Sequence, residues 1–343
     1  MILIVILLIL FILILVYIAY QQRQDYRFDI MSLLRNPETI QYHGLYTPPI
    51  FLKNASEDYF DTIKPGLKHM KDSNVLFTGL IKNGGDRIIE NMSKLELLGK
   101  YCKDYRILIL ENDSDDNTRE ILLEWRKFNK RIHLIGTDNN ECPRNGECCH
   151  IDLTKIENEE PHVRRIHRMA DLRNICLDHV LRNKYKEYDY VMVMDLDICG
   201  HLYVDGIANT FYHMARDKNI DGVGVNGLRY RQRWIYYDPF AFVEFDDSIE
   251  WPTLKEKRDH DAKISEREAY KVGDKLQRVK SCFAGCATYR MSALRKKISK
   301  DKRYDYSKTG WASEHAYLNQ HLNMYLNPSS VYYIIDNRGG DWN

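Results

Sequence analysis

The chain has 343 residues, of which 44% are hydrophobic, and its formal net charge is +1. This length suffices for one large domain or two small ones. The nearly balanced charge excludes a strong field that would select nucleic acid or an acidic partner, so no nucleic-acid binding is expected.

Residues 2–20 form an apolar run without a charged side chain. As a helix, at about 1.5 Å per residue, this run would span roughly 28 Å, close to the thickness of the bilayer core. The alternative is a cleaved signal peptide, which has a shorter apolar part, a basic stretch before it and small residues after it. Neither flank is present here, and the sequence therefore predicts a single-pass transmembrane helix over residues 1–20.

The orientation of this anchor stays open. Arg23 and Arg27 follow the run and no basic residue precedes it, which by the positive-inside rule places the catalytic part in the cytosol. A lumenal (ER- or Golgi-like) domain would instead offer glycosylation sequons. These are Asn54-Ala-Ser56, Asn91-Met-Ser93 and Asn112-Asp-Ser114.

The remaining chain divides in two. Residues 21–70 carry several prolines, among them Pro65, and little periodicity, so we predict a stem there. Residues 71–343 are predicted to form the catalytic domain. In that part, predicted strands over 74–83, 106–110, 132–135, 190–197, 222–228 and 331–335 are interspersed with predicted helices, notably over 164–184. This alternation predicts an α/β fold with a mostly parallel central sheet flanked by helices, and ligands beyond the carboxyl ends of the strands.

The run Tyr190–Asp197 ends a predicted buried strand with two carboxylates, Asp195 and Asp197. Side chains two apart in a strand share a face. Because unpaired buried charges are costly, a divalent cation with oxygen ligands is expected beside them. The D-x-D pattern also occurs at Asp113/Asp115 and Asp259/Asp261, where no apolar strand precedes it directly.

Other stretches suggest further site residues. Arg173 interrupts the apolar stripe of helix 164–184 and needs a phosphate or a carboxylate as partner. Ser281–Tyr289 has small residues, including Gly285, where a ligand can approach closely. The charged stretch 246–280 is either a solvated insertion or a flap, and the cysteines at 142, 148 and 149 suggest a disulfide or free thiols in preference to zinc.

Several of these stretches resemble known glycosyltransferases. The run from Ile109 to Thr118 resembles the E-N-x-S-x-D-x-T stretch of GT-A (Rossmann-like) DxD glycosyltransferases. Met169–Asn174 followed by the Asp195–Asp197 strand is similar to the arginine helix and DxD strand of fungal mannosyltransferases. Three further blocks resemble, in order, the capsule-associated α-1,3-mannosyltransferase family, and these are Tyr236–Asp238, Ser281–Gly285 and Ser313–His315. Asp113 and His315 depart from that family's pattern.

The resemblance implies a metal-dependent hexosyltransferase that moves mannose, with retention, from a nucleoside-diphosphate sugar (GDP-mannose or a UDP-hexose) to a glycan hydroxyl. Asp195 and Asp197 would hold Mn²⁺ or Mg²⁺, with His315 or His321 completing the metal shell. The donor would contact Glu111, Asp113, Arg173, Asp195 and Gly285. Glu314 is the candidate catalytic residue near the acceptor, and Asp116 is expected to cap the following helix.

Two other functions fit the same residues. A metal-dependent phosphodiesterase or nucleotide-sugar hydrolase would release free sugar phosphate. An inactive membrane-anchored domain would bind glycan without metal or nucleotide.

Overall fold

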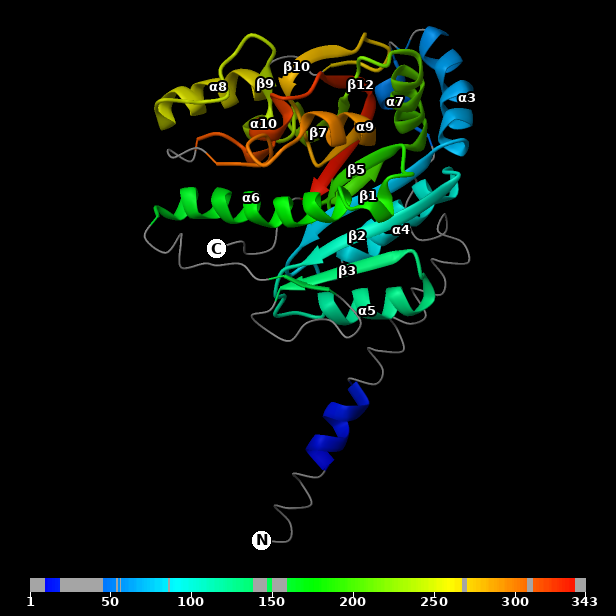
Figure 1. Ribbon diagram of the computed structural model, residues 1–343, viewed down its shortest axis with the longest axis vertical. Helices are drawn as coiled ribbons and strands as arrows, with labels where there is room; N and C mark the ends of the chain where they lie inside the picture. Colours follow the sequence, from blue (N-terminus) through cyan, green and yellow to red (C-terminus); the bar gives the residue numbers. More distant parts are fainter. Residues whose placement is uncertain are drawn as a thin grey trace.

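The computed structural model describes residues 10–18, 46–53, 55, 57–85, 87–137, 147–149, 159–266, 270–306 and 311–336. Within these residues the chain forms a twelve-stranded mixed sheet with helices packed around it (Figure 1).

The strands are β1 (Asn74–Ile81), β2 (Asp104–Glu111), β3 (Ile132–Thr137), β4 (Glu147–Cys149), β5 (Tyr190–Asp195), β6 (Cys199–Leu202), β7 (Gly222–Arg231), β8 (Arg233–Tyr236), β9 (Val243–Glu244), β10 (Gln277–Ser281), β11 (Cys286–Arg290) and β12 (Met324–Asp336). The helices are α2 (Pro49–Leu52), α3 (Glu57–Lys71), α4 (Arg87–Lys100), α5 (Thr118–Phe128), α6 (Pro161–Val180), α7 (Val204–Arg216), α8 (Leu254–Glu266), α9 (Met291–Lys297) and α10 (Glu314–Asn319), with 3-10 turns η2 (Asn183–Tyr185) and η3 (Pro239–Ala241).

The sheet has the order β4-β3-β2-β1-β5-β11-β7-β12-β10-β9, with β6 paired to β12 and β8 to β7. Its first five strands are all parallel, and so is the β7–β12 pair. Strand β11 runs antiparallel between β5 and β7. The predicted α/β fold with a largely parallel sheet is therefore confirmed for the half that contains β5, while the other half is mixed.

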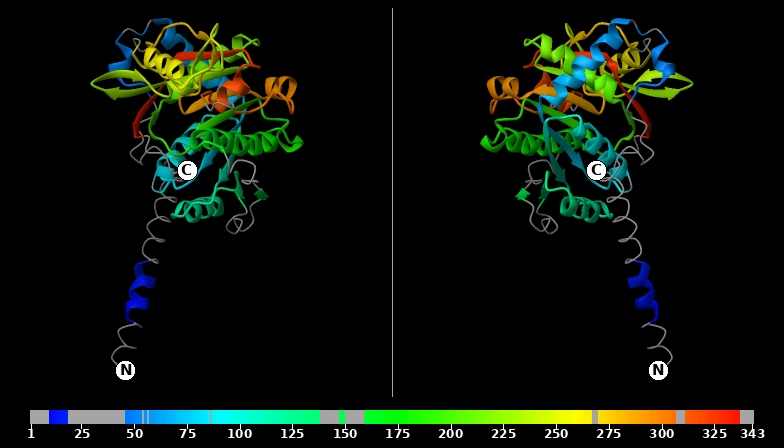
Figure 2. Two further views of the ribbon diagram at one scale, coloured as in Figure 1. Left: turned by 90° about the vertical axis from the view of Figure 1, so that its left-hand side faces the viewer. Right: turned by 90° about the vertical axis from the view of Figure 1, so that its right-hand side faces the viewer.

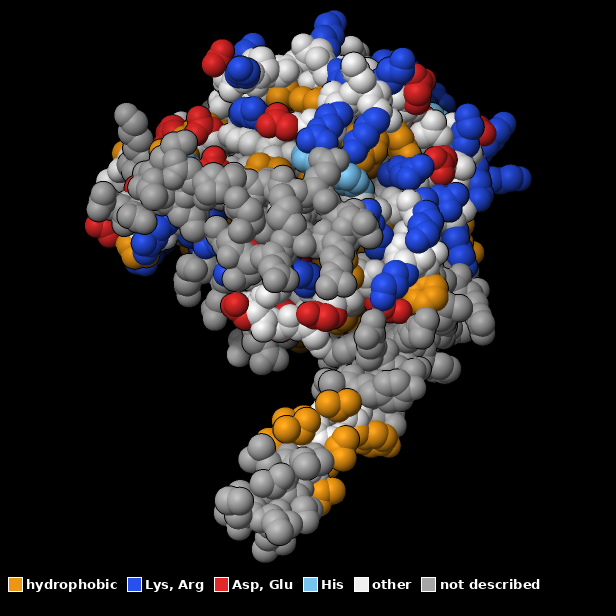
Figure 3. Space-filling view, turned by 60° about the horizontal axis from the view of Figure 1, so that its bottom comes forward, with side chains coloured by type: hydrophobic (Ala, Val, Ile, Leu, Met, Phe, Trp, Pro, Cys, Tyr) orange, Lys and Arg blue, Asp and Glu red, His pale blue; other side chains and the backbone are white. Residues whose placement is uncertain are grey.

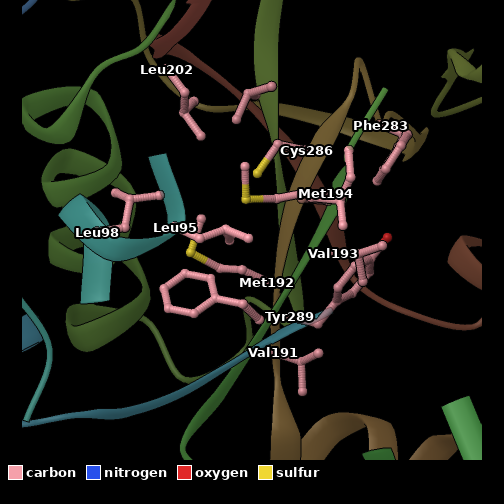
Figure 4. Close-up of a cluster of buried hydrophobic side chains, with 14 of the residues drawn as sticks. Leu95, Leu98, Val191, Met192, Val193, Met194, Leu202, Phe283, Cys286 and Tyr289 are labelled. Carbon is pink, nitrogen blue, oxygen red and sulfur yellow. The ribbon is translucent and has the colours of Figure 1, made fainter. Parts of the chain in front are cut away.

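Strand β5 is buried because both of its faces are covered. Met192 and Met194 point toward Leu95 and Leu98 of α4 (Figure 4). Val191 and Val193 point the opposite way and, with residues of α6, line an apolar cavity. A parallel strand covered on both faces is expected to be apolar throughout, which explains the run from Tyr190 to Met194.

The parallel register brings the predicted site residues to one edge of the sheet. Leu80 of β1 pairs with Asp195 of β5, and the next residue, Ile81, pairs with Glu111 of β2. The two acidic strand ends therefore flank the end of β1, at the carboxyl edge where ligands of such sheets bind.

Part of the predicted stem belongs to the folded domain. Helix α3 packs on α7, and both lie at the same end of the domain (Figures 1 and 2). Its buried residues Tyr59, Thr62, Gly66 and Met70 follow helical spacing. Pro65 lies within this helix instead of ending it, and α3 crosses the boundary predicted at residue 70, which stays a prediction. Residues 21–45 lie outside the described part.

Residues 10–18 are helical, and their apolar side chains are exposed (Figure 3). None of the helices among the described residues combines the length and apolarity that a membrane crossing requires. Residues 1–9, 19 and 20, which complete the predicted anchor, lie outside the described part.

The predicted charged insertion contains helix α8, in which Lys257 is buried and bonded to Asp261. Two sequons are unsuited to glycosylation in the folded chain, because Asn91 and Asn112 are fully buried. Asn54 and the cysteine side chains at 142, 148 and 149 lie outside the described residues.

Candidate functional site

Strand β5 leads into a tight segment, residues 195–200, which we call the acidic turn. Asp195 is the last residue of β5, and its backbone N–H donates to the carbonyl of Gly285 at 2.9 Å. The side chains of Asp195 and Asp197 are both half-buried at the carboxyl edge of the sheet. The two carboxylates that the sequence singled out therefore lie where the parallel sheet presents ligands.

Arg173 of α6 joins this turn to α10. Its Nε donates to Glu314 Oε1 at 2.8 Å and its Nη2 donates to Asp195 Oδ1 at 3.1 Å. The guanidinium also lies over the ring of Phe283, with 5.2 Å between Cζ and the ring centre. Burial lowers the pKa of Arg173, but the charges of Glu314 and Asp195 outweigh it and raise the pKa overall. One permanent cation thus holds two carboxylates from distant parts of the chain.

The carboxyl groups of the site repel one another. Burial raises the pKa of Asp195 to about 7, an effect that Arg173 opposes and the charge of Asp197 reinforces. Burial also raises the pKa of Asp238 to about 6, with the charge of Glu314 adding to it. The ionised forms of Asp195 and Asp238 are therefore disfavoured in the unliganded chain, and a bound cation would favour them.

The end of β2 offers a second group of polar side chains. Glu111 Oε1 accepts from the backbone N–H of Ser114, and Glu111 Oε2 accepts from Arg119, both at 2.6 Å. Glu111 therefore shapes its own loop with both oxygens. Asp113 is buried and has an ion-pair contact to Arg119 at 3.5 Å, yet neither of its oxygens has a hydrogen-bond partner in the described part of the chain.

Asn112 next to it is also buried, and neither polar atom of its amide is hydrogen-bonded to the described residues. Leaving a buried polar group unpaired costs about 1–3 kcal/mol. Asn112 and Asp113 are thus suited to a polar ligand. The predicted cap is confirmed in part, since Asp116 Oδ1 accepts from the N–H of Thr118 at the start of α5.

The loops at this edge contain unusual backbone conformations. Asn83, Asp113, Asp238 and Ala284 have φ between 44° and 59°. Such values are uncommon outside glycine and gather at functional sites. Gly285, at φ 84°, is also constrained by space, since an added Cβ would lie 3.0 Å from Ile198 Cδ1 of the acidic turn. Gly285 therefore supports the turn, while its contact with a donor stays a prediction.

The two histidines predicted to complete a metal shell lie in different places. His315 is buried, stacks on Phe283 with ring centres 3.7 Å apart, and keeps its Nε2 3.7 Å from Glu314 Oε1. Burial lowers its pKa well below the usual value, and the charge of Arg173 adds to the effect. His321 was the other candidate. His321 precedes β12, whose first residue, Met324, pairs with Gly222. Gly222 is in register with Tyr289 of β11, which pairs with Val191 near the start of β5. His321 therefore lies toward the amino end of β5, and it is not part of the site at the carboxyl end.

Among the described residues, no group of three or more His, Cys, Asp or Glu has an arrangement suited to a metal ion. A metal contact by His315 therefore stays a prediction.

The family model described as "Cryptococcal mannosyltransferase 1" matches residues 87–320. The chain belongs to the cryptococcal mannosyltransferase 1 family. This membership makes it a glycosyltransferase, as the ordered sequence blocks predicted. The matched span includes the acidic turn, Arg173, Glu314 and the end of β2.

Solved structures of glycosyltransferases show weak similarity to this family member. The mannosyltransferase PcManGT from Pyrobaculum calidifontis, in complex with GDP-Man and Mn²⁺, is 12% identical with a TM-score of 0.43, over 92% of this chain and 70% of that one. TarS 1–349 from S. aureus in complex with UDP-GlcNAc is 12% identical with a TM-score of 0.41, over 78% of this chain and 60% of that one. GalNAc-T7 with UDP, GalNAc and Mn²⁺ is 12% identical with a TM-score of 0.41, over 88% of this chain and 56% of that one. No curated protein sequence matches the chain.

Two residues of this cryptococcal mannosyltransferase 1 family member gain a place that sequence reasoning did not give them. Asp238 and Asn112 were quoted within family-like motifs, and Asn112 also as a sequon, but neither was named as a site residue, yet both lie among the acidic and polar groups of the site. A signal existed for Asn112, since it stands between Glu111 and Asp113 at a strand end. The position of Asp238 beside Glu314 depends on tertiary packing, and its only sequence signal was the block Tyr236–Asp238.

Proposed function

We propose that this glycosyltransferase transfers a hexose, mannose by its family, from a nucleoside-diphosphate sugar to a glycan hydroxyl with the help of a divalent metal ion. The observation that carries the proposal is the pairing of Asp195 with the buried Arg173, beside Asp197 at the carboxyl edge of the sheet. Two carboxylates two residues apart in this turn suit a cation, and Arg173 holds Asp195 in a fixed orientation.

The residues fit Mn²⁺ or Mg²⁺. Such ions are commonly held by one or two carboxylates, with substrate phosphates and waters supplying the remaining oxygen ligands. Asp197 and Asp195 would hold the metal, with one oxygen of Asp195 already bonded to Arg173. When bound, the ion would stabilise negative charge on the diphosphate leaving group. The chain itself keeps Asp195 in place, since its side chain accepts from Arg173 and its backbone N–H donates to the Gly285 carbonyl.

The nucleoside would lie at the end of β2. Asn112 offers an amide N–H₂ donor and a carbonyl acceptor, and Asp113 offers two acceptor oxygens, all buried and without a hydrogen-bond partner among the described residues. Hydroxyls of a ribose or the edge of a base would satisfy these groups. Glu111 supports this loop through Ser114 and Arg119, and its direct contact with the nucleotide stays a prediction.

Glu314 would act on the acceptor side. Its Oε1 accepts from Arg173, while its Oε2 has a contact to Ser313 Oγ at 3.4 Å. Ser313 in turn caps α10 by accepting from the N–H of His315. Oε2 is therefore the oxygen of Glu314 that can face an acceptor hydroxyl or the positive charge that develops at the anomeric carbon.

The test is Asp197→Ala. Loss of a carboxylate that holds the metal should lower metal-dependent donor turnover by at least about 100-fold, equivalent to about 2.7 kcal/mol of transition-state stabilisation. Asp259→Ala is the matched control, because Asp259 begins another D-x-D pattern but is exposed on α8. Turnover is measured by mass spectrometry of product with GDP- and UDP-sugars plus Mn²⁺.

Near-normal turnover by Asp197→Ala would reject the assignment of the metal site. Free sugar or sugar phosphate without transfer product would instead indicate a hydrolase. The anomeric configuration of the product, read by NMR, tests the retention that the family resemblance implies.

A further inference from the structure

A lysine without contact to the solvent lies directly behind the acidic turn. Lys94 of α4 is 0% exposed. Its ammonium contacts Glu90 Oε1 at 2.8 Å, Asn91 Oδ1 at 3.0 Å, the carbonyl oxygen of Ile198 at 3.3 Å and the hydroxyl of Tyr332 at 3.2 Å. The buried ammonium of Lys94 thus has three hydrogen bonds and one ion pair, and one of the hydrogen bonds is to the acidic turn.

Such a group needs an explanation. Taking an ammonium out of water is costly unless charges and hydrogen bonds compensate it. A lysine four residues after a glutamate normally pairs with it on the helix surface, where the pair stabilises the fold little. Here Glu90 is 34% exposed while Lys94 is fully buried, and burial lowers the pKa of Lys94 despite the charge of Glu90. A surface ion pair does not require this burial.

The same cluster holds the backbone of the turn. Asn91 Nδ2 donates to the carbonyls of Leu196, at 2.8 Å, and Ile198, at 3.1 Å. Glu90 Oε1 accepts from the N–H of Gly200 at 2.8 Å. Together with the Lys94–Ile198 bond, these contacts fix the carbonyls on both sides of Asp197.

We propose that Glu90, Asn91 and Lys94 act as a positioning clamp that sets the orientation of Asp197. Lys94 has no side-chain contact to Asp195 or Asp197 and acts through the backbone of the turn and through Asn91 and Glu90. Its bond to Tyr332 also ties the turn to β12, the strand that pairs with β6, which begins within the turn. The position of the clamp is argued from the structure alone, whereas the metal ion that Asp197 would bind comes from the proposed function.

The first arm of the test needs no ligand. Lys94→Met keeps an unbranched side chain and removes the ammonium. We expect hydrogen–deuterium exchange of the amides of residues 196–200 to become at least about tenfold faster, because one tenfold step corresponds to the loss of a single hydrogen bond to a charged group. Lys100→Met, at the exposed end of the same helix, is the matched control and should leave that exchange unchanged.

The second arm measures Mn²⁺ binding by electron paramagnetic resonance of free Mn²⁺, together with KM and kcat for the donor. Lys94→Met should raise the Mn²⁺ dissociation constant and the donor KM by about tenfold or more, with exchange in α5 and the β3 strand unchanged. A purely structural role would instead lower the melting temperature and leave Mn²⁺ affinity of the folded fraction intact.

Unchanged exchange at 196–200 in a folded Lys94→Met protein would overturn the clamp, whatever the enzyme does. Faster exchange in that variant, combined with a wild-type protein that binds no Mn²⁺ and turns over no donor, would support the clamp and reject the proposed function. If Lys94→Met fails to fold, Glu90→Ala replaces it. Glu90 is partly exposed, and its loss removes the Gly200 and Lys94 contacts together. Wild-type exchange at Gly200 in Glu90→Ala would equally overturn the proposal.

Discussion

Asp238 shows how one side chain of the site makes stability depend on pH. Burial raises its pKa to about 6, the charge of Glu314 adds to the rise, and Lys257 opposes it. Between about pH 4 and 6 the native chain holds a proton that the unfolded chain has lost. The contribution of Asp238 to the free energy of unfolding is therefore largest below about pH 4, and it decreases as the pH rises from about 4 to 6.

Asp238→Asn should remove this dependence. Asparagine tolerates the positive φ of 59° at this position, and it has no charge to lose or gain. We expect the free energy of unfolding at pH 7.5 to increase by no more than about 3 kcal/mol, and its difference between pH 5 and 7.5 to shrink, with Asp195 leaving a residual slope of the same sign. Urea denaturation at both pH values measures it.

The control for this variant is Asp301→Asn, because Asp301 is exposed. Its pH dependence should equal that of the wild type. A wild-type pH dependence in Asp238→Asn would show that the carboxyl is not held in an environment that disfavours its ionised form.

Single residues also mark the limit of sequence reasoning. The position of Arg173 on an apolar helical face predicted a phosphate or carboxylate partner, and its partners are two carboxylates. The sequence could not name Glu314, because 141 residues separate the two and no periodicity links them. Glu111 was assigned to the nucleotide from its place at a strand end, whereas its two oxygens accept from the nearby Ser114 and Arg119.

At the scale of elements, the carboxyl ends of strands were predictable and the start of the domain was not. Apolar runs that end in acidic residues identified β2 and β5, since burial on both faces leaves a continuous apolar signal. Helix α3 was missed because Pro65 was counted among the prolines that predicted a stem. The helical spacing of Tyr59, Thr62, Gly66 and Met70 was the stronger signal, and it describes the face that packs on α7.

Gly66 gives an element-scale prediction with an unusual sign. Glycine to alanine within a helix normally stabilises by about 0.5–1 kcal/mol. At Gly66 an added Cβ would lie 2.0 Å from the backbone oxygen of Ala208 in α7. We expect Gly66→Ala to destabilise by about 1–3 kcal/mol, because the two helices must separate to admit the methyl group.

Thermal unfolding followed by circular dichroism measures this change. Lys64→Ala, at an exposed position of the same helix, should melt near the wild-type temperature. If Gly66→Ala melts at or above the wild-type temperature, the close contact of α3 with α7 is not present in solution.

At the scale of the whole molecule, the folded unit begins well before the predicted catalytic boundary. Thr47 donates to Asp205 through both its backbone N–H and its hydroxyl, each at 2.8 Å. Phe51 packs among the rings of Tyr203, Trp234 and Tyr333. These contacts attach residues 46–53 to the parts of the chain that follow the acidic turn, so the approach to the domain is part of its structure.

The helix at residues 10–18 exposes its apolar side chains. We propose that it belongs to a membrane anchor over residues 1–20. The full chain should then sediment with membranes and be released by detergent but not by alkaline carbonate. The fragment 46–343 should stay in the supernatant and keep the melting temperature and donor turnover of the detergent-released full chain. Release of the full chain by carbonate alone would reject the anchor.

The fragment 72–343, which starts after α3, tests the boundary itself. This fragment lacks α3, so α7 is uncovered. The hydrogen bond from Asn209 to Thr62, at 2.7 Å, is lost, and so are the buried side chains of Tyr59 and Met70. Burying a large apolar side chain is worth about 1.5–3 kcal/mol, and a domain of marginal stability does not tolerate several such losses together. We therefore expect 72–343 to lack a cooperative unfolding transition. A fragment 72–343 that melts cooperatively near the temperature of 46–343 would place the start of the autonomous domain after α3, and α3 would then be an accessory to the fold.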